Sequence, residues 1–285
     1  MSQATIEGLN QATERYEGLR TLSEGEIKIF EIVREVVLKY LESIGYVEGI
    51  KKLRLLDLNK IRIYRQKSIL VNGEWTVIKV KGTYSPDDIM EFPESTLVSS
   101  EFFDIGTHEF FHYVTRGLAV LEVSKDEHLS GLKTRFPSLT EAITETLPRC
   151  LLPEGTIFAH DSINGIYRFI LQVLIRKIVA DKNILNRQNG LKEAWKIFQD
   201  DYFYGTSNFV YEIQRLYGAP MVKKLEDLGM DKDADIDTLK EIHTSSGDDF
   251  ADEVVGMVFR EINTASIELD ILETELREVV MPQNP

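Results

Sequence analysis

The chain has a single cysteine, Cys150, among its 285 residues. It can therefore form no internal disulfide bond, and a metal or iron–sulfur site built from several thiolates is excluded. The sequence also lacks internal repeats and low-complexity segments, which argues against solenoids and other repeat architectures.

No apolar stretch of the sequence is long enough to predict a membrane span. Ile163 to Ala180 is the most apolar stretch, but charged residues such as Arg168 and Arg176 interrupt it. It is too short and too charged to cross a bilayer. Met1 to Leu22 is polar and of mixed charge, without the apolar centre of a secretory signal. We therefore expect a soluble, cytoplasmic protein.

Basic residues are scarce relative to acidic ones. The chain has 33 Lys and Arg against 47 Asp and Glu, which gives a net charge of −14. A phosphate backbone or an anionic membrane would repel such a surface, so neither nucleic acid nor a membrane is an expected partner. An acidic surface also serves solubility alone. With 43% hydrophobic and 28% charged residues, the composition is that of an ordered globular protein.

The first third of the chain combines an amphipathic helix with short strands. A capping box opens at Ser23, and apolar residues then recur every three or four positions, so a helix is predicted to about Ile44. Alternating apolar residues predict strands at Lys60–Arg65, Trp75–Tyr84 and Ile89–Ser99. The last of these is expected to return antiparallel and to form an edge of the sheet.

From Phe102 onward the pattern is almost entirely helical, with breaks rich in Gly, Pro, Asp or Asn. The breaks are predicted at Lys125–Pro137, Pro153–Gly155, Asn186–Gly190 and Lys232–Asp237. The predicted helices are Phe103–Leu118, Leu139–Leu147, Ile163–Asp181, Leu191–Phe198, Ser207–Tyr217, Met221–Leu228, Asp248–Ile262 and Ala265–Val279.

The fold class is therefore α+β, with a small antiparallel-edged sheet followed by a mostly helical C-terminal half. We divide the chain into three parts. Residues 1–50 form an N-terminal helical segment, residues 51–120 carry the sheet and the helix at the junction, and residues 121–285 form a helical subdomain.

The helix at the junction contains the sequence His108-Glu109-Phe110-Phe111-His112. Two histidines four positions apart project from one face of a helix and can bind one Zn²⁺. Glu109 is rotated away from the pair, where its carboxylate can take a proton from metal-activated water. Such a motif also arises by chance, so it is suggestive and not decisive.

A catalytic zinc site needs a third protein ligand and an open fourth position. Glu141 is the candidate, because it lies in an otherwise apolar or small helix, far enough from His112 for the chain to turn back. Glu145, one turn later, is a candidate to accept the outer N–H of a ligand histidine. The alternative is that both glutamates are solvated surface charges.

These residues resemble those of the gluzincins, zinc peptidases with a His-Glu-x-x-His helix and a later glutamate ligand. The stretch around Met90-Glu91-Phe92-Pro93 is similar to the Gly-x-Met-Glu-Asn-Pro strand of the aminopeptidase-N and leukotriene-A4-hydrolase branch. In that branch the glutamate holds the amino terminus of the substrate, which implies substrate binding by Glu91. Asp88 replaces the glycine and Phe92 the asparagine, and Glu91 has the alternative of a strand residue facing outward.

The same resemblance extends to two later stretches. Leu139 to Thr144 is similar to the third-ligand helix of the family, and the stretch from Tyr202 to Gly218 is similar to the helix whose tyrosine stabilises the oxyanion. Either Tyr202 or Tyr204 matches that tyrosine; the alternative is that both are core aromatics. The resemblance implies a zincin-like fold, a Zn²⁺ cofactor and a peptide or protein substrate.

The expected chemistry is peptide-bond hydrolysis, in which Glu109 is the general base and an extended peptide adds to the strand at Ile89–Ser99. A non-catalytic binding or assembly module on the same scaffold is the first alternative, although the intact Glu109 argues against it. A di-iron site is the second: Glu109-x-x-His112 matches half of its motif, but no second Glu-x-x-His occurs. The remaining histidines are predicted to be surface or structural residues; they are His128, His160 and His243.

Overall fold

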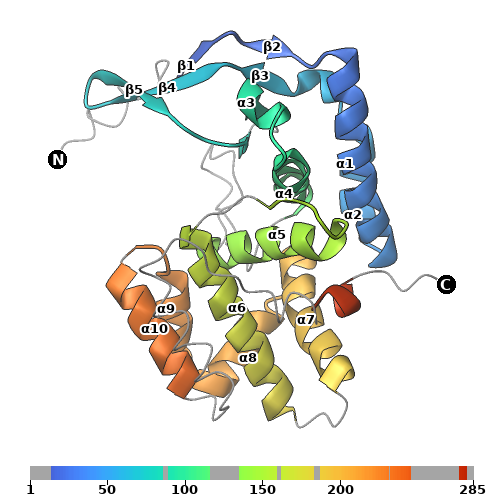
Figure 1. Cartoon of the computed structure of the whole chain (residues 1–285). Coiled ribbons are helices and arrows are strands. Elements are labelled where there is room, and N and C mark those ends of the chain that lie inside the picture. Colours follow the sequence, from blue (N-terminus) through green and yellow to red (C-terminus); the bar gives the residue numbers. More distant parts are fainter. Residues whose placement is uncertain are drawn as a thin grey trace, which may run out of the picture.

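The computed structural model describes residues 14–85, 89–115, 135–158, 162–182, 187–230, 232–244 and 276–280. It confirms the predicted α+β class: two small sheets lie at one end of the molecule, and most of the remaining described chain is helical (Figure 1). The strands are β1 (Glu14–Glu17), β2 (Arg20–Thr21), β3 (Arg62–Tyr64), β4 (Gln66–Val71), β5 (Glu74–Ile78), β6 (Thr83–Ser85) and β7 (Ile89–Pro93). The helices are α1 (Glu24–Ser43), α2 (Val47–Leu55), the 3₁₀ turn η3 (Leu58–Lys60), α3 (Glu94–Leu97), α4 (Phe102–Val114), α5 (Pro137–Leu151), α6 (Ser162–Asp181), α7 (Arg187–Tyr204), α8 (Asn208–Tyr217), α9 (Ala219–Glu226) and α10 (Lys232–Thr244).

A two-stranded ribbon joins the two sheets. The first sheet has the order β1-β4-β5 and the second the order β2-β3-β7-β6. Strands β1 and β2 follow one another closely, and only Arg65 separates β3 from β4. The segments β1–β2 and β3–β4 are the two strands of this ribbon. Because β1 and β2 pair with one side of the β3–β4 segment, β5 and β7 both lie along its other side. The pairing of β3 with β7 is parallel, and the other pairings are antiparallel.

The strand predicted at Ile89–Ser99 is wrong in two respects. It ends at Pro93, where α3 begins, and Thr96 of this helix donates a hydrogen bond to the carbonyl of Lys81 at 2.6 Å. It is also an interior strand, because β3 pairs with one side of β7 and β6 with the other. The prediction at Trp75–Tyr84 covers two separate strands, β5 and β6. Strands β6 and β2 are the two edges of the second sheet.

Helix α1 confirms the capping box that the sequence predicts. The side chain of Ser23 accepts a hydrogen bond from the backbone N–H of Glu26, and the Glu26 carboxylate accepts one from the N–H of Ser23. Residues 1–50, predicted to be a helical segment, also contain the strands β1 and β2 and the start of helix α2. The sequence predicted none of these three elements. Both strands pair with strands of the 51–120 segment.

Six of the predicted later helices correspond in place to α4 to α9, but their lengths differ. Helices α5 and α7 are longer than predicted, and α10 occupies the break expected at Lys232–Asp237. Buried Asp235 there accepts hydrogen bonds from the backbone N–H of Gly229, a contact that local composition does not indicate. The helix predicted at Asp248–Ile262 and most of Ala265–Val279 lie outside the described residues. None of the described helices combines the length and apolarity needed to cross a bilayer.

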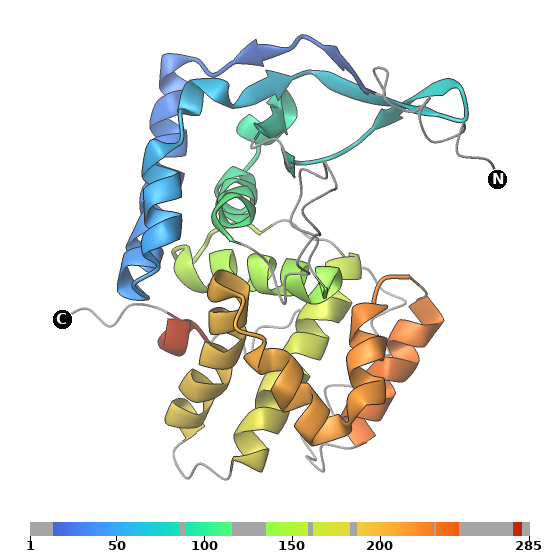
Figure 2. The same ribbon diagram turned by 180° about the vertical axis from the view of Figure 1, so that it is seen from behind.

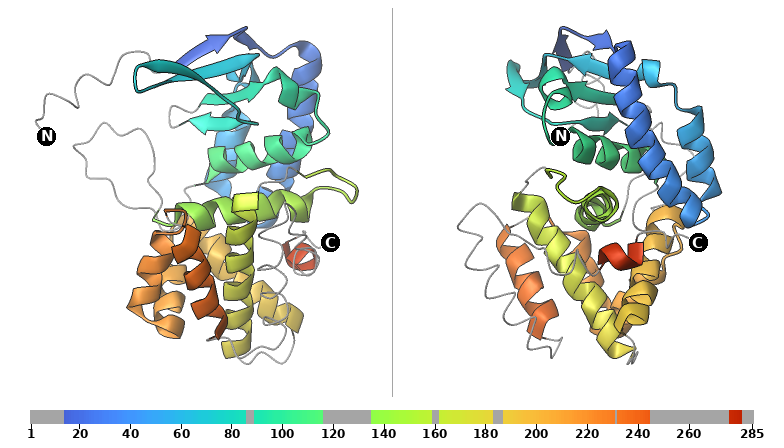
Figure 3. Two further views of the ribbon diagram at one scale, coloured as in Figure 1. Left: turned by 60° about the vertical axis from the view of Figure 1, so that its left-hand side comes forward. Right: turned by 45° about the vertical axis from the view of Figure 1, so that its right-hand side comes forward.

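The core that supports α4 is largely aromatic. The ring of Phe30 on α1 lies 5.1 Å from that of Phe92 on β7 and 5.0 Å from that of Phe102 on α4, measured between centroids. In space the sheets, α4, α5 and the remaining helices follow one another as layers, with α1 and α2 along one flank (Figure 2 and Figure 3). Helix α5 packs between α4 and α6, so α4 and α5 meet at the junction of the two halves.

The segment at 276–280 is helical and packs against the end of α5. Leu276 and Val280 are buried. The Nε of Arg277 donates to the backbone carbonyl of Cys150 at 3.2 Å, in the last turn of α5. A segment far along the chain therefore satisfies carbonyl groups that the helix end leaves without partners.

Candidate metal centre

Helix α4 carries two histidines on a face that is only partly covered. Its apolar side chains, among them Phe102, Phe110 and Phe111, are buried in the core. His108 and His112 lie one turn apart, and their side chains keep 18% and 19% of their surface exposed. Both imidazoles therefore project from the same side of the helix and remain accessible to solvent.

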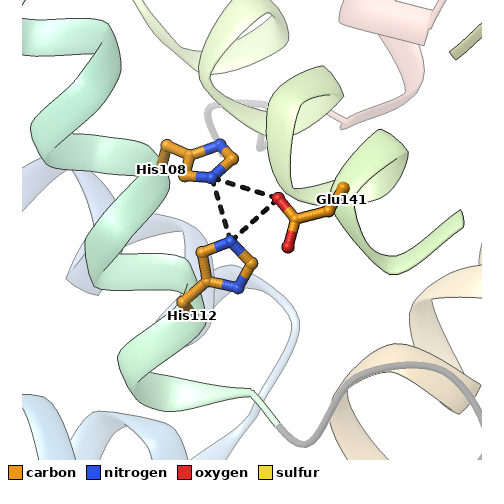
Figure 4. A group of neighbouring side chains, drawn as sticks. All are labelled: His108, His112 and Glu141. Atoms are coloured by element: carbon orange, nitrogen blue, oxygen red, sulfur yellow. Dashed lines mark hydrogen bonds and ion pairs between the residues drawn. The ribbon is translucent and has the colours of Figure 1, made fainter. Parts of the chain in front are cut away.

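Helix α5 brings a carboxylate to the same place. The helix has Pro137 in its first turn, a position that requires no backbone donor. Its residues are mostly buried, except along a stripe that contains Glu141 and Glu145. Since α5 packs directly on α4, Glu141 points at the two histidines (Figure 4).

Three potential ligand atoms meet between the two helices. The Nε2 atoms of His108 and His112 lie 2.9 Å apart. Oε2 of Glu141 lies 3.4 Å from Nε2 of His108 and 3.2 Å from Nε2 of His112. Within the described parts of the chain, no other three His, Cys, Asp or Glu side chains converge in this way. The structure thus unites the three residues that the sequence predicts as ligands.

The spacing of these atoms fits a zinc ion. In a tetrahedral site with metal–ligand distances of about 2.0–2.1 Å, two ligand atoms lie about 3.3 Å apart. The three measured separations, 2.9, 3.2 and 3.4 Å, are close to that value. The Glu141 side chain is 40% exposed, so solvent can approach the group from one side, as an open fourth position requires. The second half of a di-iron site is not found among the described residues.

The charges in this group depend on one another. Burial lowers the pKa of His108. Its hydrogen bond with Glu141 and the charges of Glu109 and Glu141 have the larger, opposite effect, and the pKa rises to about 9. Burial raises the pKa of Glu141, yet the charge of His112 and the hydrogen bonds from both imidazoles hold it well below its usual range. A proton on His108 thus balances the carboxylate. A divalent cation at the same point would provide this balance in place of the proton.

Glu109 lies beside the three ligand atoms and is buried. Burial raises the pKa of its carboxyl group, and the charges of His108 and His112 partly offset that increase. Its carboxylate also accepts a hydrogen bond from the backbone N–H of Tyr84 on β6. The carboxylate of Glu109, the general-base candidate, therefore connects α4 to the edge strand β6.

Gly82, just before β6, is a part of this arrangement that the sequence analysis missed. A Cβ atom at this position would lie 3.0 Å from the side chains of Ile105 and Phe92 and 3.1 Å from Cγ of Glu109. A larger residue would require these side chains to move, so glycine suits the close approach of the chain to α4. The available signal was a glycine within an otherwise β-rich stretch, a pattern that marks close backbone approach.

Glu145 follows Glu141 by one turn, as predicted, and its charge is one of the causes that raise the pKa of His108. Its Oε2 lies 3.3 Å from Nε of Arg168 on α6, and the Arg168 side chain is buried. This ion pair thus links the Glu145 carboxylate on α5 to helix α6. Acceptance of an imidazole N–H by Glu145 stays a prediction.

Glu91 does not join the three ligands. It lies on β7 and is buried, and its Oε2 accepts hydrogen bonds from Nζ of Lys67 at 3.0 Å and from the hydroxyl of Tyr16 at 2.7 Å. Nη1 of Arg62 lies 3.4 Å from its other oxygen. The alternative of an outward-facing, solvated strand residue does not describe it either. Its carboxylate belongs to a network with the ribbon strands.

The two candidate tyrosines occupy different environments. Tyr202 is fully buried, and its hydroxyl lies 2.6 Å from Oγ1 of Thr144 on α5. Burial raises the pKa of this phenol, and the charge of Glu141 adds to that increase. Tyr204 is exposed and donates to the carbonyl of Ile44 at 3.2 Å, at the end of α1. An oxyanion role for either residue stays a prediction.

No family model matches this chain, and no curated protein or solved structure matches it significantly. The geometry of the site is therefore the observation that indicates a function.

Proposed function

We propose that this protein is a zinc-dependent peptidase of the gluzincin type, with His108, His112 and Glu141 as the metal ligands. The convergence of the two Nε2 atoms and one carboxylate oxygen within 3.4 Å carries the proposal. Two features support a zincin-like fold: α4, which carries the two histidines, packs beneath a small sheet, and α5, which provides the glutamate, packs on α4.

Glu109 is the proposed general base. A zinc ion bound here would lower the pKa of a water molecule and polarise the peptide carbonyl. The Glu109 carboxylate would take a proton from the attacking water and deliver it to the leaving amine. Its raised pKa suits this exchange, because a group that both accepts and donates a proton works best when its pKa is near the ambient pH.

Strand β6 is the proposed support for the substrate. It is the edge of its sheet, and Tyr84 within it contacts Glu109 through a backbone hydrogen bond. An extended peptide can add to such an edge as a further strand, with its backbone held by main-chain hydrogen bonds. This assignment replaces the strand at Ile89–Ser99, whose two sides are already paired.

Removal of the metal tests the proposal. The purified protein should contain about one zinc per chain and should hydrolyse an unfolded protein such as β-casein. Treatment with 1,10-phenanthroline should abolish hydrolysis, and added Zn²⁺ should restore it, whereas the non-chelating 1,7-isomer should have no effect. Undiminished hydrolysis by the zinc-free protein would contradict the proposal.

A smaller effect is expected for Glu145→Ala. Residues that orient metal ligands by hydrogen bonds typically contribute roughly 10- to 100-fold to metal affinity. We therefore expect the zinc dissociation constant to rise by about that factor, measured by competition with a chromogenic chelator. Glu193→Ala, which removes an exposed carboxylate on α7, is the matched control. Equal zinc affinity in the two variants would exclude a positioning role for Glu145.

A further inference from the structure

The segment that resembles the amine-binding strand of aminopeptidases is displaced from the edge of the sheet. Strand β7, which contains Glu91, pairs with β3 on one side and with β6 on the other. Both sides of its backbone are therefore used within the sheet. A substrate that pairs with the outer side of β6 would be separated from β7 by the full width of one strand.

The carboxylate of Glu91 already binds a primary ammonium group. Nζ of Lys67 lies 3.0 Å from one oxygen of Glu91, and the two side chains are only 8% and 5% exposed. Arg62 and Tyr16 complete the set of partners. The amino terminus of a substrate is chemically the same group as the Lys67 side chain. It would have to displace an ion pair that is already formed and shielded from water.

Displacement of Lys67 would be unfavourable. Its remaining carboxylate partner is Glu14, at 2.8 Å. Loss of Glu91 would leave a buried ammonium with fewer of its compensating charges, and buried ions that lose a partner are strongly destabilising. The network therefore joins β7 to the ribbon strand β4, and a second ammonium at Glu91 would have to compete with Lys67 for the same carboxylate.

A second outer strand, β5, precedes β6 along the chain. Among the described strands, β5 and β6 each have a neighbour on one side only, and both lie on the same side of the ribbon. Figure 1 shows β5 leading into β6 above the layer of α5. Trp75 and Val77 on β5 keep 46% and 51% of their surface exposed. Like β7, β5 lies next to the ribbon, so the outer side of β6 is one strand further out than β5. The exposed side chains of β5 therefore flank the edge at which an extended chain would bind.

From these contacts we infer that the enzyme cleaves within a polypeptide chain and does not recognise a free amino terminus. The inference rests on the proposed peptidase function and specifies its substrate class: an extended, unfolded segment with residues on both sides of the scissile bond. The aminopeptidase specificity that the sequence resemblance implies would require a free Glu91 at the substrate edge.

Two measurements test this inference. Products of β-casein after brief digestion are first identified by mass spectrometry, and internal fragments are expected, not a ladder of residues lost from the amino terminus. A peptide that spans the fastest site is then compared with and without an acetylated amino terminus. Acetylation should leave kcat/KM unchanged, whereas an enzyme that binds the ammonium through a charged hydrogen bond would lose roughly 10- to 100-fold.

Glu91→Gln provides a second comparison. If Glu91 holds the substrate amine, this variant should lose the preference for the free peptide; under our inference the ratio of the two kcat/KM values is the same in both proteins. A terminal ladder, or a wild-type preference for the free amine that Glu91→Gln removes, would overturn the inference while leaving the peptidase proposal intact. Failure of the zinc-loaded protein to cleave any substrate would overturn both.

Discussion

Replacing Glu109 by glutamine is expected to lower kcat by about 10²- to 10⁴-fold, the range that general acid–base catalysis contributes. Glutamine keeps the size of the side chain but cannot take a proton from water. The metal ligands are unchanged, so zinc content should stay near one per chain. Initial rates on a fluorogenic peptide, together with metal analysis of the same sample, check both parts of the expectation.

The control for this variant is Glu35→Gln, which removes an exposed carboxylate on α1. It should retain wild-type rates. A Glu109→Gln protein with full zinc and full activity would remove the general-base assignment. If all proteins bind zinc but none hydrolyses peptides, the alternative of a non-catalytic binding module is favoured.

The second large effect is expected for His112→Ala, which should lose zinc and all hydrolysis. The two remaining ligands, His108 and Glu141, cannot complete a tetrahedral site with three protein donors. Wild-type protein should also gain about 4 kcal/mol of stability at a free zinc concentration a thousand times its Kd, a gain that the variant should lack. Thermal unfolding with and without zinc measures this difference.

His243→Ala is the matched control, because His243 lies in α10 and is not predicted to be a ligand. It should keep its zinc and its zinc-dependent rise in Tm. A His112→Ala protein that retains one tightly bound zinc would refute the ligand assignment, whatever its activity.

The three residues of the candidate metal centre could be predicted because the main determinants of their positions are local. Helical spacing places His108 and His112 on one face, and the composition around Glu141 indicates a second buried helix. The α+β class follows from the change between alternating and helical periodicity along the chain. None of these inferences requires knowledge of which strands are neighbours.

The errors concern contacts between distant segments. The sequence around Glu91 is compatible with an edge strand, and only its pairing with both β3 and β6 makes it interior. Lys67 lies 24 positions before Glu91, so no local pattern announces their ion pair. The same holds for Tyr202, whose hydroxyl meets Thr144, 58 positions away. Strand order and side-chain partners of this kind depend on the tertiary fold.

The position of the three ligand atoms on two different helices has a mechanical consequence. His112 and Glu141 are 29 positions apart and belong to elements that sit in different layers of the molecule. An ion bound by both closes a loop in the chain and, like a covalent cross-link, reduces the freedom of the unfolded state. The same cation would therefore stabilise the packing of the sheet-bearing half against the helical half. Its loss would weaken that packing as well as abolish the proposed hydrolysis.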